Sequence, residues 1–126
     1  MQKIVIHFES FSCEAEIHDT PTGQEILKSL PLECSINTWG NEIYFSIAPN
    51  LPLEPDAREI TSIGELGYWP SGRAFCIFFG PTPASNNGEP RAVSPVNIFG
   101  RITTPDVPTL LRKVSTGEKV LIVKTK

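Results

Sequence analysis

The chain has 126 residues, a length that fits one domain with a buried core. Its 11 basic and 14 acidic residues are scattered and give a net charge of −3, which excludes the basic surface of proteins that bind nucleic acid or anionic membranes. No apolar run approaches the roughly 18 residues of a membrane span. Cys13, Cys34 and Cys76 lack disulfide or zinc spacing. We therefore predict one cytoplasmic domain over residues 1–126 with reduced core cysteines.

The first third of the chain predicts a β-hairpin followed by a helix. Apolar and polar residues alternate over 4–8 and over 11–17, with a turn at Glu9-Ser10. Thr22 and Glu25 have the spacing of a capping box, so we expect a short amphipathic helix at about 23–30, before Pro31.

A second hairpin is centred on Gly40-Asn41, because glycine in first place suits a two-residue β-turn. This turn pairs Trp39 with Glu42, and it sets the register of both strands. One face, on which residues 34, 36 and 38 oppose 47, 45 and 43, should join the core. The opposite face carries Trp39, Glu42 and Tyr44 and is aromatic and polar.

The remaining sequence predicts further short strands. Three prolines in 48–57 indicate an extended surface crossing, and strands are expected at 58–60, between Gly64 and Gly67, and at 74–79, the last buried on both faces. Residues 80–95 lack periodicity and predict a long loop at the rim of a cleft. A strand at 96–102, a short helix around 110–114 and a strand at 120–123 complete the chain. About eight strands with two short helices favour a closed β-barrel.

Several segments resemble an uncharacterised prokaryotic family of small cyclophilin-like proteins. The resemblance covers nearly the whole chain and is carried by four strings: Asn37–Phe45, which includes Glu-Ile-Tyr-Phe; Gly64–Pro70, which includes Gly-Tyr-Trp-Pro; Phe78–Pro83; and Val96–Gly100. It implies an eight-stranded cyclophilin-like barrel capped by two helices, with a cleft on the outer face of the sheet.

The catalytic residues of true cyclophilins are not matched. In those isomerases the cleft binds an Xaa-Pro peptide with an arginine, a glutamine and a histidine. Here Asn97, not a histidine, precedes Ile-Phe-Gly, the Gln-Gly-Gly segment is absent, and the hairpin at 35–46 has no arginine. Arg58, Arg73, Arg91 and Arg101 occupy other positions, so we predict no established catalysis and no catalytic residues.

Large amphipathic rings on a face outside the core tend to mark a binding surface, although the same rings could plug a barrel end. The preferred hypothesis is a cleft for a small ligand or peptide. The alternatives are a weak peptidyl-prolyl isomerase and a protein-interaction module that docks through residues 80–95. The candidate ligand-binding residues are Trp39, Glu42, Tyr44, Tyr68, Trp69, Phe79 and Thr82.

Other chemistry is not indicated. His7 and His18 are separated along the first hairpin, and two such ligands do not make a metal site. No glycine-rich phosphate cradle precedes either helix. Cys76 lies in a strand of continuous hydrophobicity and is interpreted as inert core. We expect no metal, cofactor, nucleic-acid or membrane partner, and the oligomeric state stays open.

Overall fold

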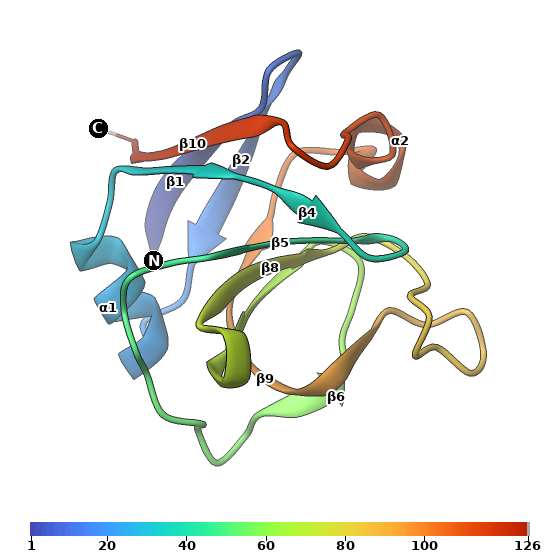
Figure 1. The fold of residues 1–126 in the computed structure, drawn as a ribbon. Helices are drawn as coiled ribbons and strands as arrows, with labels where there is room; N and C mark the ends of the chain where they lie inside the picture. Colours follow the sequence, from blue (N-terminus) through green and yellow to red (C-terminus); the bar gives the residue numbers. More distant parts are fainter. Residues whose placement is uncertain (126) are drawn as a thin grey trace.

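The computed structural model describes residues 1–125 and is mainly β, with two short helices (Figure 1). The predicted architecture is confirmed, although the strands number ten rather than about eight. The elements are β1 (Gln2–His7), β2 (Ser12–Ile17), α1 (Pro21–Lys28), β3 (Leu32–Ser35), β4 (Asn37–Thr38), β5 (Glu42–Ser46), β6 (Arg58–Ile60), β7 (Glu65–Trp69), β8 (Ala74–Phe78), β9 (Arg91–Ile102), α2 (Val107–Leu111) and β10 (Lys119–Lys124).

One antiparallel sheet runs in the order β3-β10-β1-β2-β9-β7-β8-β5-β4, and β6 pairs with β9. Its two ends, β3 and β4, are consecutive in the chain and are separated only by Ile36. The backbone of Ile36 pairs with the turn before β10, since its N–H donates to the Glu118 carbonyl and its carbonyl accepts from the Gly117 N–H. A single bent segment therefore brings the two edges of the curled sheet together.

The sheet has one large core inside and a smaller apolar cluster outside. At the centre Phe75 stacks on Phe45, with ring centroids 5.0 Å apart, and meets Phe99 edge to face, with centroids 5.1 Å apart. The strand β8 contributes to both sides, because Phe75 and Ile77 point into the large core while Ala74, Cys76 and Phe78 belong to the outer cluster. The prediction that this strand is buried on both faces is confirmed. Its outer face becomes the floor of a cleft.

The helix α1 begins two residues earlier than expected. The Thr20 hydroxyl accepts from the Gly23 N–H at 3.0 Å and caps the helix, because Pro21 at the first helical position places the cap one residue before it. The predicted capping box at Thr22 is therefore wrong. Thr22 is buried instead, and its hydroxyl donates to the Glu54 carboxylate and accepts from Asn97 at 3.0 Å.

The hairpin register is confirmed near its turn and differs further away. Asn37 lies opposite Tyr44, and Thr38 lies opposite Ile43, as expected. Cys34 departs from the prediction, because β3 turns away from β5 and pairs Cys34 with Val120 of β10. Its side chain is only partly buried, whereas Cys13 and Cys76 are fully buried.

The predicted long loop is shorter than 80–95, because β9 already begins at Arg91. Pro95 favours the prediction of a loop here, because proline is rare inside strands. Pro95 lies where the pairing of β6 with β9 is irregular, between the partners Arg58–Val96 and Ile60–Arg91. A proline without a backbone N–H is tolerated at such a bulge.

The proline crossing at 48–57 contains no strand, as predicted, and is held by buried polar groups. The Tyr68 hydroxyl donates to the Pro49 carbonyl at 2.7 Å and accepts from the Leu51 N–H at 3.1 Å. Asn97 accepts from the Glu54 N–H at 2.8 Å and donates to the Pro52 carbonyl at 3.0 Å. These hydrogen bonds hold the irregular segment at 48–57 against the barrel.

Candidate functional site

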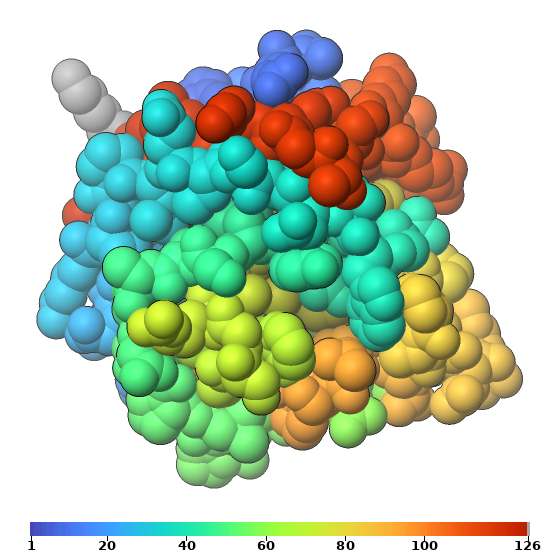
Figure 2. Space-filling model, viewed as in Figure 1, coloured from blue at the N-terminus to red at the C-terminus, as the bar shows by residue number. Residues whose placement is uncertain are grey.

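A cleft of about 250 Å³ lies on the outer face of the sheet, above the smaller apolar cluster. Three aromatic side chains, one carboxylate and the apolar start of β9 surround it. In Figure 2 the hairpin around residue 40, the turn after β7 and the start of β9 meet on the face in view. The lining residues are Trp39, Glu42, Tyr44, Trp69, Ala92, Val93 and Val96.

The hairpin turn sets the wall formed by Trp39, Glu42 and Tyr44. Gly40 has a φ of +59°, which glycine adopts without strain, and Trp39 and Glu42 exchange backbone hydrogen bonds of 2.9 and 3.1 Å across the turn. Residues directly opposite share a face, as do alternate residues of one strand, so all three side chains project to the same side. The prediction of this shared face is confirmed.

Glu42 is a carboxylate in an apolar setting. Its side chain is 7 % exposed, and its strand partner on β8 is Phe78. Burial raises the pKa of Glu42 to about 7, and only the neighbouring Cys76 thiol acts in the opposite direction. The pKa of Cys76 is in turn raised by burial and by Glu42. None of the ion pairs among residues 1–125 includes Glu42.

Trp69 closes the cleft from the end of β7. Its indole N–H donates to the Ser94 hydroxyl at 2.6 Å, which ties the ring to β9. The ring also covers Gly72, where the Cβ atom of any larger residue would lie only 2.7 Å from it, so the absence of a side chain at Gly72 permits this packing. The ring is therefore fixed from two sides and presents a preformed wall.

The loop at 79–90 is tied to the hairpin that carries Trp39. Asn41 donates to the Pro81 carbonyl from both its backbone and its side-chain nitrogen, each at 2.9 Å. The Phe79 N–H donates to the Asn41 carbonyl at 3.0 Å. These bonds hold the start of the loop against the turn beside the cleft.

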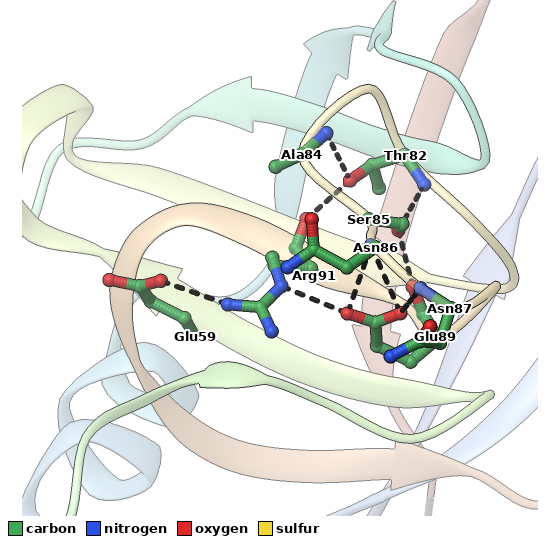
Figure 3. Close-up of polar contacts among 8 residues, drawn as sticks. All are labelled: Glu59, Thr82, Ala84, Ser85, Asn86, Asn87, Glu89 and Arg91. Carbon is green, nitrogen blue, oxygen red and sulfur yellow. Dashed lines mark hydrogen bonds and ion pairs between the residues drawn. The ribbon is translucent and has the colours of Figure 1, made fainter.

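The rest of this loop is ordered by its own polar groups (Figure 3). The Glu89 carboxylate accepts from the backbone N–H groups of Asn86 and Asn87 and from Arg91 Nε at 2.9 Å. The Asn87 N–H contributes most to lowering the pKa of Glu89 to about 2, followed by Arg91. The Thr82 hydroxyl donates to the Arg91 carbonyl at 2.5 Å and closes the loop.

Four of the seven predicted site residues line the cleft: Trp39, Glu42, Tyr44 and Trp69. The other three are corrected. Tyr68 has no exposed surface and points into the large core, because it alternates with Trp69 along β7. Phe79 is 3 % exposed in the same core, and the Thr82 side chain is turned into its own loop.

The third wall consists of Ala92, Val93 and Val96, which were not among the predicted site residues. Ala92 and Val93 lie in the segment expected to be a loop at the rim of the cleft, and Val96 begins the predicted strand at 96–102. Their apolar character was the available signal. None of the four candidate arginines lines the cleft. Arg58, Arg91 and Arg101 instead form ion pairs with carboxylates on the barrel surface.

Residues 1–125 contain neither a metal-binding cluster nor a membrane-spanning helix. No group of three His, Cys, Asp or Glu side chains in this part of the chain could hold a metal ion. Neither described helix has the length and the apolar character needed to span a membrane.

Comparison with known proteins identifies the same architecture. A family model described as "Cyclophilin-like" matches residues 2–123. The solution structure of a hypothetical protein from Archaeoglobus fulgidus is 35% identical, with a TM-score of 0.82 over 98% of this chain and 95% of that one. The structure of McbB in complex with tryptophan is 16% identical, with a TM-score of 0.72 over 97% of this chain and 44% of that one, and its likeness is one of fold. No curated protein sequence gave a significant match.

Proposed function

The chain belongs to the cyclophilin-like family, and we propose that its outer cleft binds a small, largely apolar molecule. The convergence of three aromatic rings and one buried carboxylate on a single hollow carries this proposal. Aromatic side chains supply large contact areas with few rotatable bonds, so they bind at a low entropic cost. The fixed position of Trp69 adds a wall that is formed before any ligand arrives.

The size of the cleft narrows the ligand class. Drug-sized molecules occupy pockets of roughly 300–1,000 Å³, and this cleft, at about 250 Å³, lies just below that range. A molecule with one or two rings fits better than a long peptide. Tryptophan, which the McbB structure contains, is a reasonable first probe of this size.

Peptidyl-prolyl isomerisation is the less favoured alternative. Catalysis of that rotation requires donors placed to stabilise a twisted amide. No arginine of the described chain lines the cleft, and the Trp69 indole N–H is already bonded to Ser94. Exchange NMR on an Ala-Pro peptide tests the alternative, and we expect unchanged cis–trans exchange at high protein concentration.

Both tryptophans of the chain line the cleft, so intrinsic fluorescence reports directly on its occupancy. A library of one- and two-ring compounds should yield ligands that change this fluorescence and shift the amide NMR signals of residues 39–44 and 92–96. We expect Trp39→Ala to weaken these ligands at least tenfold, because it removes one wall.

Tyr68→Phe is the matched control, since Tyr68 is aromatic and adjacent to Trp69 but points into the core. It should leave ligand affinity unchanged while it lowers stability by about 1–3 kcal/mol, because two backbone groups of the proline crossing lose their partner. A second hollow lies between the N-terminus and α1 and is lined by residues that include Gln2, His18 and Gln24. Ligands that instead shift the amide signals of that hollow, or a library without any ligand, would refute the proposal.

A further inference from the structure

The carboxylate of Glu42 is a charged group in the cleft that no cationic side chain of residues 1–125 neutralises. It faces the hollow, it is 7 % exposed, and no cationic side chain among residues 1–125 pairs with it. A buried carboxylate without a partner is unfavourable, and such groups are normally paired with a cation or bound by strong donors. The cleft therefore offers a strong acceptor that contacts the Cys76 thiol but no cationic side chain of residues 1–125.

The titratable groups around Glu42 do not supply that cation. The thiol of Cys76 faces it from β8, and the phenol of Tyr44 lies two residues away on the same side of β5. The walls from the hairpin, β7 and β9 contribute Trp39, Trp69 and aliphatic side chains. Arg91 is the arginine nearest along β9, but its guanidinium is held on the loop side by Glu89 and Glu59 (Figure 3).

The rings around this carboxylate favour a positive charge as well. Tryptophan and tyrosine attract cations through their faces, and this attraction is strongest where water is excluded. Trp39, Tyr44 and Trp69 surround the same hollow, and the chain as a whole carries a net charge of −3. An aromatic ring of the ligand can pack against Ala92 and Val96, while its charged end meets Glu42.

We propose that the ligand of this cleft is a small aryl-alkyl amine, whose ammonium group pairs with the Glu42 carboxylate while its ring packs against Ala92 and Val96. This inference rests on the proposed function, because it names the ligand class of the same cleft. It makes Glu42 the residue that determines specificity.

A set of isosteric probes isolates the charge from the ring. Phenethylamine, 2-phenylethanol and 3-phenylpropionate share a phenyl body with a positive, neutral or negative end, and tryptamine and tryptophol repeat the first two on an indole. Affinities are measured by NMR titration at about pH 8. A charge-assisted hydrogen bond contributes enough to predict that each amine binds roughly tenfold to a hundredfold more tightly than its alcohol. The carboxylate should bind most weakly.

Glu42→Gln keeps the shape of the side chain and removes its charge. In this variant the amine should lose its advantage, and the amine and the alcohol should bind with similar affinity. Amine binding to the wild type should also strengthen from about pH 6 to pH 8, because burial raises the pKa of Glu42 to about 7 and the carboxylate ionises over this range. The ligand ammonium, similar to that of lysine, remains charged.

The outcomes separate this inference from the proposed function. If all probes bind in the cleft with equal affinity, or the anion binds best, the amine assignment is wrong and the apolar cleft still binds ligands. If the amines bind but Glu42→Gln has no effect, the charge is recognised elsewhere and the role of Glu42 is wrong. If no probe binds, both statements fail for this ligand size.

Discussion

At the scale of single residues, Glu42, the charged group of the proposed binding cleft, also affects the stability of the protein. Its pKa is raised from 4.5 to about 7 in the folded protein, so the folded state holds a proton that the unfolded state has released at intermediate pH. The free energy of unfolding therefore falls as pH rises above about 4.5, and the loss is complete above about 7. At 1.36 kcal/mol per unit, this shift corresponds to about 3 kcal/mol.

We predict that Glu42→Gln stabilises the protein by up to about 3 kcal/mol at pH 8 and has little effect near pH 4.5. The reason is that a neutral amide at this site replaces an ionised carboxylate at the higher pH and a protonated one at the lower pH. Urea denaturation at both values measures the difference.

Glu25→Gln is the control for this prediction. Glu25 lies on the exposed surface of α1, where its ion pair with Lys28 is solvated, and its replacement should show no comparable pH dependence. A gain from Glu42→Gln that is the same at both pH values would contradict the raised pKa. A carboxylate that destabilises the folded protein is consistent with a binding role, since function is often maintained at the expense of stability.

Residue-level prediction worked where a turn defined the register. Gly40-Asn41 was enough to place Trp39, Glu42 and Tyr44 on one face, because the side-chain period of a strand is two. It failed for Tyr68, since adjacent aromatic residues on a strand buried on both faces give no sign of which one points inward. The hydroxyl that holds Pro49 and Leu51 could be recognised only from the structure.

At the scale of elements, the loop at 79–90 depends on one carboxylate. Backbone N–H groups and Arg91 depress the pKa of Glu89 to about 2, so its stabilising contribution is present above about pH 4.5 and is lost as pH falls toward 2. We predict that Glu89→Gln increases amide exchange at residues 82–91 at neutral pH, because the neutral amide accepts these bonds less strongly. Hydrogen exchange followed by NMR measures the effect.

Glu118 offers a comparison, because its carboxylate also accepts a backbone N–H, from Ser115, at a different turn. Glu118→Gln should leave exchange in the 82–91 loop unchanged. Equal protection of that loop in the wild type and in Glu89→Gln would show that the hairpin contacts at Asn41 alone order it.

Local sequence signals predict most element boundaries correctly, but the predictions are wrong at two prolines. The strand at 58–60 and the proline crossing were predicted with their observed limits. Pro95 favours the prediction of a loop where the structure has β9. The irregular pairing with β6 that tolerates this proline is a tertiary contact, which the local sequence does not reveal. Pro21 occupies the first helical position and so places the helix cap at Thr20, a signal that the sequence contains.

At the scale of the whole molecule, strands from both ends of the chain interleave. The first and last strands pair with each other, β1 with β10, and β2 pairs with β9, so no single cut in the chain divides the sheet into two separate parts. The seam at Ile36 also depends on both β3 and β4. We therefore propose that the chain folds as one cooperative domain.

Equilibrium unfolding in urea tests that proposal with two local probes. Each variant retains one tryptophan. Trp39→Phe leaves Trp69 at the end of β7, and Trp69→Phe leaves Trp39 in the turn between β4, an edge strand of the sheet, and β5. Both fluorescence transitions should coincide with the loss of far-UV circular dichroism, with one slope in the range of roughly 1–3 kcal/mol per molar urea. Separate midpoints would show that the cleft wall unfolds before the barrel. Coincident midpoints mean that a ligand bound in the cleft stabilises the entire domain, because its binding free energy is then linked to global unfolding.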